Sequence, residues 1–288
     1  MTPVAALAWL LLQTTQQNSA QAPKPAPQNP SPMVEHTRSH PRLQRETPPG
    51  ERIPLGTGTL YVPPAAGRRS GVPLLIFFHG GKWLPEVAAQ RTRQAAIVIQ
   101  LGVGSGTYAR EFEDRERFPE LLAEAEQKSG LRFGAITLGG WSAGCAAVRE
   151  ILRGERAYER VSNVLCIDGI HTGYVDGKPG PLESNIETGN LTTWLKAGRD
   201  AIAGHKRVVV THSEIFPGTF ASTTETADYL VRELGIKRRA VLRWGPMGTQ
   251  QLSEARQGKL LIVGYAGNSA PDHVDQLHSL PEYLRWLD

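Results

Sequence analysis

A serine in the centre of the motif G-W-S-A-G, Ser142, lies where a strand pattern gives way to a helix pattern. The apolar run at 133–140 predicts a strand, and the spacing at 144–152 predicts a helix. A sharp turn between such elements strains its corner residue and lifts the side chain above the sheet, and the following N–H groups can stabilise an oxyanion. The motif alone could be a plain Gly-Ser turn, but its flanking elements favour a nucleophilic serine.

A serine hydroxyl attacks a carbonyl group well only when a base removes its proton. His273 and His278 both follow the last clear strand pattern, at 259–267. We expect His273 in a loop that reaches back over the strand ends, and His278 in packing or at the surface. The order nucleophile, acid, histidine along the chain favours His273 as the base. The alternative for His273 is a surface residue beside other polar side chains.

Two acidic residues are candidates for orienting the histidine. Asp168 ends the apolar run "VLCID" and is followed by a glycine, whereas Glu214 comes one predicted strand later, in "THSEIF". A carboxylate directly at the end of a buried strand is hard to explain as surface filler, so we favour Asp168. Glu214 occupies the more usual place for the acid and stays open as the alternative.

Strand-like and helix-like segments alternate around these residues. This alternation predicts an α/β fold with a doubly wound, mostly parallel sheet, whose functional groups lie at the carboxyl ends of the strands. Ser222 and Glu225 form a predicted capping box at the start of one helix. The predicted strands are 73–81, 94–104, 133–140, 162–169, 207–212 and 259–267, and the predicted helices are 118–130, 144–152, 222–234 and 278–287.

The N-terminal part of the chain differs in composition from the rest. Residues 1–22 contain a short apolar block and an A-x-A site, which predict a cleaved signal peptide and a secreted or periplasmic protein with no membrane span after cleavage. A buried N-terminal helix is the alternative. Residues 23–50 are rich in proline and predict a disordered linker, so the catalytic domain is expected at 51–288.

Composition narrows the range of functions. The net charge of +4 is spread along the chain, which argues against nucleic-acid binding. Cys145 and Cys166 are the two cysteines, and we interpret them as buried free thiols, with a disulfide as the alternative. The expected chemistry needs side chains and backbone N–H groups only, so no metal or cofactor is predicted.

The chain resembles α/β-hydrolase-fold serine hydrolases of the esterase and lipase type, from "FFHGGKW" through "GGWSAGC" to "APDHVDQL". The resemblance implies two-step acyl transfer, with the backbone N–H groups of Gly81 and Ala143 as the oxyanion hole and His79 as a structural residue. The chain departs from the lipase-like H-G-G-G pattern at Lys82, and the segment 167–174 matches no common esterase signature.

Aromatic residues near these motifs are candidates for binding the substrate. We predict this role for Tyr108, Trp141 and Trp83, with core packing as the alternative for the tryptophans. The stretch 171–200 is longer than a connection requires and predicts a cap over the site. Its residues His171 and Tyr174 either face the pocket or pack within the loop.

The features together predict an exported serine hydrolase that cleaves a carboxylic ester, either a small molecule or a polymer. A serine peptidase of the same fold is one alternative. A binding protein that keeps the fold without the chemistry is another.

Overall fold

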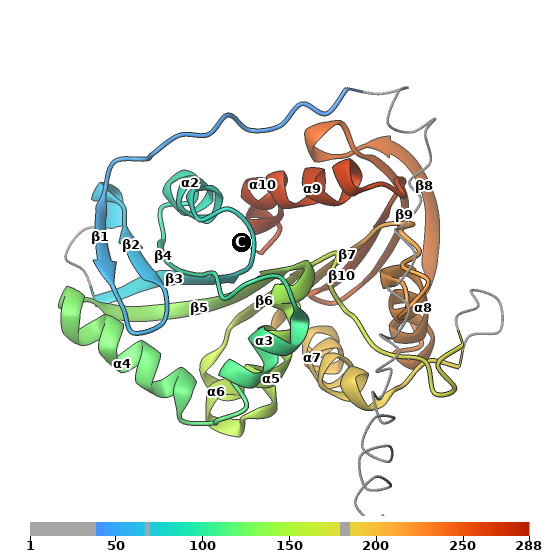
Figure 1. Cartoon of the computed structure of the whole chain (residues 1–288), viewed down its shortest axis with the longest axis horizontal. Helices are drawn as coiled ribbons and strands as arrows, with labels where there is room; N and C mark the ends of the chain where they lie inside the picture. Colours follow the sequence, from blue (N-terminus) through green and yellow to red (C-terminus); the bar gives the residue numbers. More distant parts are fainter. Residues whose placement is uncertain (1–38, 67–69, 179–184, 288) are drawn as a thin grey trace, which may run out of the picture.

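A mixed sheet forms the centre of the computed structural model, which describes residues 39–66, 70–178 and 185–287. In this part of the chain the sheet has ten strands in the order β1-β2-β4-β3-β5-β6-β7-β10-β9-β8 (Figure 1). The six central strands, from β4 to β10, pair in parallel, and two antiparallel strands flank them at each edge. The prediction of a doubly wound, mostly parallel sheet is confirmed.

The six parallel strands are those that the apolar runs predict. They are β3 (Ser70–Phe78), β4 (Ala95–Ile99), β5 (Arg132–Trp141), β6 (Asn163–Ile167), β7 (Arg207–His212) and β10 (Leu260–Tyr265). The four edge strands were not predicted, because they are short or carry many polar side chains. They are β1 (Glu51–Pro54), β2 (Thr59–Val62), β8 (Arg238–Trp244) and β9 (Gln250–Gln257).

Helices cover both faces of the sheet, as Figure 1 shows. One face carries α2 (Trp83–Arg91), α9 (Ala270–His278) and α10 (Leu280–Arg285). The other carries α3 (Ser105–Glu111), α4 (Arg117–Ser129), α5 (Cys145–Arg153), α6 (Glu155–Arg160), α7 (Thr192–Ile202) and α8 (Thr223–Glu233). Short 3₁₀ turns complete the described part: η1 (Pro64–Ala66), η2 (Ser142–Gly144), η3 (Gly189–Leu191) and η4 (Pro246–Gly248).

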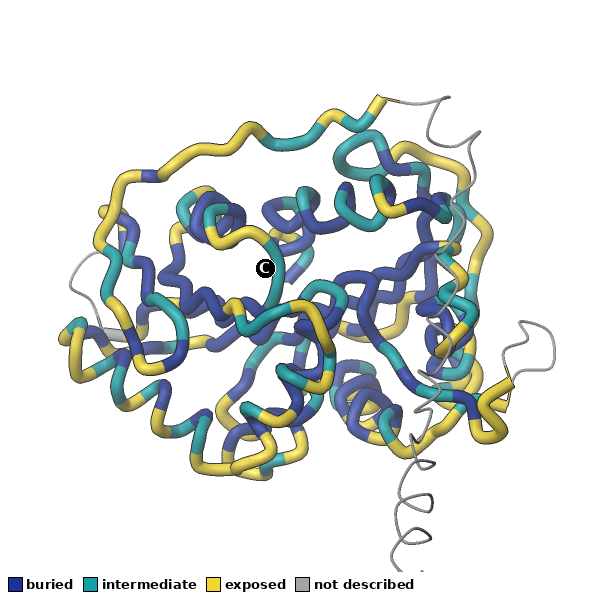
Figure 2. Tube along the Cα trace, in the orientation of Figure 1, coloured by how far each residue is buried: buried dark blue, intermediate teal, exposed yellow. Residues whose placement is uncertain are grey.

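Each face of the sheet has its own apolar core. Leu84 of α2 and Tyr283 of α10 belong to one core, and Leu121 of α4 and Ile151 of α5 belong to the other. The central strands lie between the two cores and are buried along almost their whole length (Figure 2). This explains why their sequences are continuous apolar runs instead of alternating patterns.

Local signals decide where several helices begin and end. Gly130 ends α4 in the left-handed conformation, with φ of 71°. The capping box of Ser222 and Glu225 is present at the start of α8, as predicted. A second capping box, of Ser269 and Asp272, begins α9, which was not predicted. The helix predicted at 278–287 is observed as α10, which follows α9 after Ser279.

Two residues of the predicted linker at 23–50, His40 and Arg42, contact the domain, whereas most of the described residues of that segment are exposed. Arg42 donates a hydrogen bond to Asp275 over 2.8 Å and another to the carbonyl of Pro271 over 2.9 Å. His40 Nδ1 lies 2.5 Å from the same carboxylate, which is fully buried. Both acceptor residues belong to α9. The predicted signal peptide and the rest of the linker lie outside the described residues.

The predicted cap at 171–200 is in part an ordinary connection between strands. Its last third forms η3 and the start of α7, which follows β6 along the chain and packs against β7 and β10. Trp194 and Leu195 of α7 are buried in the core. Its first residues pack beside α8, where the hydroxyl of Tyr174 donates to Glu225 over 2.9 Å. Residues 179–184 lie outside the described part.

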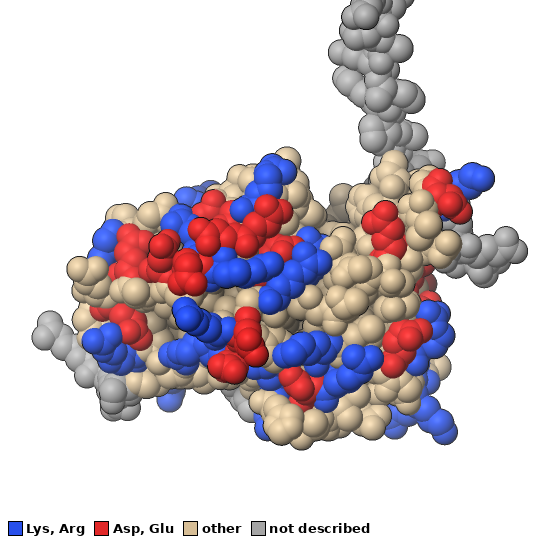
Figure 3. All heavy atoms as spheres, turned by 90° about the horizontal axis from the view of Figure 1, so that it is seen from below, with Lys and Arg blue, Asp and Glu red and all other residues tan. Residues whose placement is uncertain are grey.

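The face over α4 and α6 carries charges of both signs, interspersed (Figure 3). Several of them are paired, such as Arg132 with Glu126 at 2.6 Å and Lys128 with Glu124 at 2.8 Å. This face therefore offers no large field of one sign to a charged polymer. Within the described ranges, no helix has both the length and the apolar character needed to cross a membrane.

Candidate active site

Ser142 occupies a sharp turn between β5 and α5. Its backbone is left-handed, with φ of 50°, which is uncommon for a residue with a side chain. The turn is tight because its glycines have no Cβ: one on Gly140 would lie 2.8 Å from the nitrogen of Cys145, and one on Gly144 would strike the carbonyl oxygen of Phe78. The residues around Ser142 therefore fold as the strand–turn–helix pattern predicts.

Asp168 follows β6 directly and also has a left-handed backbone, with φ of 43°. Its carboxylate is buried, and Oδ1 accepts hydrogen bonds from the backbone of Ser213 at 2.9 Å and from the hydroxyl of Thr223 at 2.6 Å. Oδ2 accepts from the hydroxyl of Ser213 at 2.7 Å and from His273 Nδ1 at 2.7 Å. Burial alone would raise the pKa of Asp168, but the hydrogen bonds and the charge of His273 outweigh burial and lower it to about 2. The carboxylate is therefore ionised and can only accept.

His273 lies in the first turn of α9, not in a loop as expected, because the Ser269–Asp272 capping box starts the helix before it. An ionised Asp168 requires the proton of the imidazole on Nδ1, so Nε2 carries the lone pair. His273 and Ser142 line the same cavity. The structure thus brings the three residues Ser142, His273 and Asp168 together at the carboxyl ends of β5, β6 and β10.

The alternative candidates for base and acid have other contacts. Glu214 is exposed, and its backbone N–H donates to the carbonyl of Gly267 over 3.0 Å. Its carboxylate accepts a long hydrogen bond, 3.4 Å, from the backbone of the same glycine. His278 packs edge-on against Trp83, with ring centroids 5.7 Å apart. Neither residue lines the cavity that holds Ser142.

Trp141 connects three parts of the site. Its ring stacks on His79, with centroids 5.1 Å apart, and lies 4.5 Å from the ring of His273. Its Nε1 donates to the carbonyl of His273 over 3.1 Å. These contacts hold α9 and the loop after β3 against β5, as the packing alternative predicts, and a role of Trp141 in substrate binding stays a prediction.

Tyr108 and Trp83 are also not part of the cavity wall. Tyr108 is fully buried, and its hydroxyl is shared among His79 Nδ1 at 3.0 Å, the N–H of Leu101 at 3.2 Å and the carbonyl of Gly102 at 3.1 Å. Tyr108 thus joins two loops, and Trp83 begins α2 and packs on His278. Their roles in substrate binding stay predictions.

The proposed oxyanion donors lie in two turns that touch each other. Ala143 follows Ser142 in the 3₁₀ turn, and Gly81 is exposed just before α2. A Cβ on Gly144 would also lie 2.9 Å from Cβ of His79, so the turn after Ser142 rests directly on the loop that contains Gly81. His79 has a left-handed backbone, with φ of 73°, and shapes this loop. The assignment of the two N–H groups stays a prediction.

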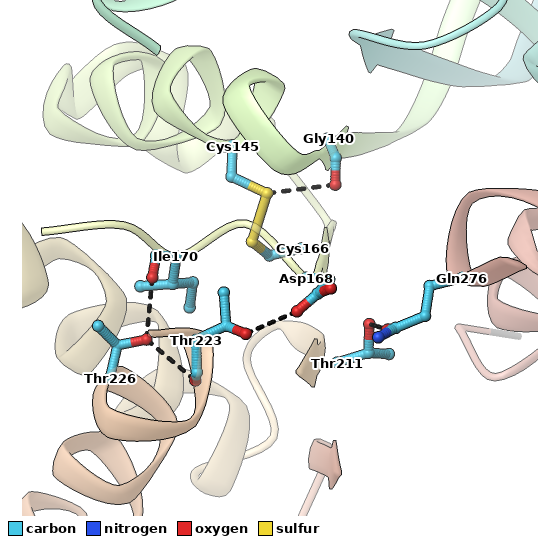
Figure 4. The surroundings of a disulfide bond; sticks show 9 residues. All are labelled: Gly140, Cys145, Cys166, Asp168, Ile170, Thr211, Thr223, Thr226 and Gln276. Atoms are coloured by element: carbon cyan, nitrogen blue, oxygen red, sulfur yellow. Dashed lines mark hydrogen bonds between the residues drawn. A yellow bond between two sulfur atoms is a disulfide. The ribbon is translucent and has the colours of Figure 1, made fainter. Parts of the chain in front are cut away.

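A disulfide joins Cys145 and Cys166, which corrects the interpretation of both as free thiols. Cys145 opens α5, three residues after Ser142, and Cys166 lies two residues before Asp168 (Figure 4). The bond forms because β5 and β6 are neighbours and end at the same edge of the sheet. It therefore fastens the strand that carries the acid to the turn that carries the serine.

Sequence reasoning missed three residues that organise Asp168. Ser213 and Thr223 donate to its carboxylate from the end of β7 and the start of α8. Gly169 is needed because a Cβ there would lie 2.7 Å from the nitrogen of Ser142 and 2.6 Å from the sulfur of Cys145. Two features of the sequence could have indicated these roles: a hydroxyl residue directly after a predicted strand, and the glycine that follows Asp168.

One cavity, of about 260 Å³, opens beside Ser142 and His273. Its apolar wall is formed by Ile215, Pro217, Phe220 and Ala270. His171 also lines it, whereas Tyr174 is tied to α8 as described above. Of the two predicted alternatives for His171, the structure thus favours the pocket.

A separate group of possible metal ligands consists of His40, Asp272 and Asp275, whose ligand atoms lie within 4.8 Å of one another. The same atoms already have protein partners. Arg42 donates to Asp275, and Ser269 donates to Asp272 at 2.6 Å as part of the capping box. A cation would compete with the guanidinium group of Arg42 for Asp275. These residues are therefore better explained as polar contacts that attach the segment before β1 to α9 than as a metal site.

No protein-family model and no curated protein sequence matches the chain. Among solved structures, it is similar to an ester hydrolase from the metagenome of Lake Arreo, with 15% identity over 84% of this chain and 86% of that one and a TM-score of 0.45. It is similar to an esterase from the fungus Rhizomucor miehei, with 15% identity, coverage of 83% and 82% and a TM-score of 0.44. It is also similar to an acetyl xylan esterase from Aspergillus awamori, with 14% identity, coverage of 81% and 98% and a TM-score of 0.43.

These likenesses are too distant to carry an argument about chemistry, so the fold is identified from its own features. The central sheet is parallel and covered on both faces. The serine stands on a strained strand-to-helix turn at the carboxyl end of β5, and the acid and the histidine follow it in that order along the chain. The chain has the α/β-hydrolase fold.

Proposed function

We propose that this protein is a serine hydrolase that cleaves carboxylic esters through an acyl-enzyme intermediate. The observation that supports this best is the contact of His273 with the buried, ionised Asp168, at the mouth of the cavity that Ser142 also lines. A carboxylate held by three other donors has no evident purpose at this place other than to orient the imidazole. The left-handed backbones of His79, Ser142 and Asp168, three strained positions at one site, also favour a catalytic role.

In the proposed reaction, Nε2 of His273 takes the proton of Ser142 as the hydroxyl attacks the ester carbonyl. Asp168 stabilises the imidazolium that forms. The N–H groups of Gly81 and Ala143 bind the oxyanion, and each is worth about 3 kcal/mol of the barrier. His273 then gives the proton to the departing alcohol, and water repeats the sequence on the acyl-enzyme. The net change is the addition of one water molecule across the ester bond, which yields an acid and an alcohol.

We also propose that the protein works outside the cytosol. The Cys145–Cys166 disulfide supports this location, because disulfides persist in oxidising compartments and are rare in the cytosol. The predicted signal peptide at 1–22 is a separate argument from the sequence. The substrate is then an ester in the periplasm or outside the cell, either a small molecule or a polymer. Nucleic acid is not expected as a partner, and no membrane span is expected after signal cleavage.

The test is covalent labelling of the purified protein with a fluorophosphonate probe, followed by peptide mapping. We expect one adduct per chain, on Ser142, and none in the Ser142→Ala variant. Hydrolysis of p-nitrophenyl esters of increasing acyl length then separates an esterase from a binding protein. A folded protein that forms no adduct and turns over no ester contradicts the proposal.

A further inference from the structure

The cavity beside Ser142 is small and has an apolar wall on one side. Its volume of about 260 Å³ is below the usual range for pockets that bind drug-sized ligands, which begins at about 300 Å³. Ile215, Pro217 and Phe220 come from the segment between β7 and α8, and Ala270 comes from the start of α9. A group that enters this cavity must therefore be compact, and most of its surface must be apolar.

His171 is the polar side chain that interrupts this wall. Its ring packs edge-on against Phe220, with centroids 5.1 Å apart and planes at 80°. Thr223 also reaches the cavity, but its hydroxyl already donates to Asp168. His171 has no such engagement within the described residues: its Nδ1 is shielded from solvent and has no hydrogen-bond partner there.

The protonation of this imidazole follows from its surroundings. Desolvation by burial lowers the pKa of His171 to about 4, so the ring is neutral near pH 7 and carries one proton. The shielded Nδ1 lacks a partner among the described residues in either tautomer, as a donor or as an acceptor, whereas Nε2 does not share that shielding. With the proton on Nε2, the ring would present a donor to the cavity that it lines. A molecule in the cavity with an oxygen acceptor would select this tautomer by accepting from Nε2.

We propose that His171 selects esters whose group in this cavity is compact, mainly apolar and carries one oxygen atom that accepts a hydrogen bond from Nε2. An ether, carbonyl or hydroxyl oxygen would satisfy this donor, and a purely hydrocarbon group of the same size would leave it unpaired. This proposal rests on the proposed esterase function. It concerns the choice of substrate, whereas Ser142, His273 and Asp168 carry the reaction.

The test compares two pairs of esters that differ in one atom of the chain. The first pair varies the acyl group, p-nitrophenyl 3-methoxypropanoate against p-nitrophenyl pentanoate. The second varies the alcohol, 2-methoxyethyl acetate against butyl acetate. For each pair, the ratio of kcat/KM in the wild type is divided by the same ratio in His171→Leu, which cancels differences in intrinsic reactivity.

We expect this quotient to be roughly 3 to 10 for one pair, as for one net hydrogen bond, and near 1 for the other. The pair that responds tells which side of the ester lies in the cavity. Phe220→Leu is the matched control: it changes the wall without removing the donor, so both members of a pair should shift together. Should His171→Leu fail to fold, His171→Asn removes the donor from reach while keeping a polar side chain.

A quotient near 1 for both pairs overturns the role of His171. That outcome is distinguishable from failure of the proposed function, because labelling of Ser142 by a fluorophosphonate does not depend on the group in the cavity. An adduct on Ser142 together with quotients of 1 supports the proposed esterase function but contradicts substrate selection by His171. A folded protein that forms no adduct contradicts both proposals.

Discussion

Replacing Asp168 by Asn tests whether its carboxylate sets the tautomer of His273, the proposed general base. The amide oxygen is expected at the position of Oδ1, because that atom accepts from the backbone of Ser213 and from Thr223. The amide NH₂ then replaces Oδ2 and faces Nδ1 of His273, which must present its lone pair. The proton of the imidazole moves to Nε2, and this nitrogen can then no longer accept the proton of Ser142.

The expected loss follows from this exchange of donor and acceptor. A histidine held in the wrong tautomer lowers kcat by about 10⁴-fold, or about 5.5 kcal/mol of barrier. The assay is the steady-state hydrolysis of a p-nitrophenyl ester, with the rate of fluorophosphonate labelling as a second measurement. The fold should survive, since the substitution preserves the shape of the side chain, and circular dichroism checks this.

Glu214→Gln is the matched control, because Glu214 is exposed and contacts Gly267 instead of His273. We expect its kcat to stay within about threefold of the wild type, since surface substitutions rarely have large effects. If Glu214→Gln lost activity while Asp168→Asn kept it, the assignment of the acid and the argument from the tautomer would both be refuted.

Three further predictions concern the same region. The pKa of Asp168 is lowered from 3.8 to about 2 in the folded state, so its ionisation stabilises the fold by roughly 2 kcal/mol above pH 4. This contribution is lost as the pH falls toward 2. The difference in free energy of unfolding between wild type and Asp168→Asn, measured with urea, should therefore shrink over that range. Replacing Cys145 and Cys166 together by Ala opens a loop of sequence separation 21 and should lower the free energy of unfolding by about 3 kcal/mol, and an unchanged urea midpoint would contradict this. Gly169→Ala places a methyl group against the backbone of Ser142 and should lower kcat for ester hydrolysis by about 100-fold. The rate is measured at a low temperature at which the variant is folded, so that a loss of stability alone would leave kcat unchanged.

The sequence contained enough information to predict the central sheet and to favour Ser142, His273 and Asp168 as candidates, with Glu214 left open as the acid. Buried parallel strands leave continuous apolar runs, and the carboxyl ends of such strands share one edge, so Ser142, Asp168 and His273 could be placed together without coordinates. The capping box that puts His273 on a helix was also readable, because Ser269 is followed three residues later by Asp272.

Other features depend on contacts that a single sequence does not display. Strand β8 has no buried residue and β9 is only partly buried, so their sequence patterns resemble those of loops. The disulfide requires that β5 and β6 be neighbours, which the spacing of its cysteines does not reveal. The same holds for Tyr108 and Trp141: an aromatic side chain near a site can line it or brace it, and its partners decide which.

The disulfide also closes a covalent ring that contains α5 and α6. A single cut by a protease between Cys145 and Cys166 would therefore leave the two fragments joined, one with Ser142 and the other with Asp168 and His273. On a gel without reductant the nicked chain would run as one species, and only reductant would release the pieces. The three proposed catalytic residues thus stay in one molecule even when the chain between them has been cleaved.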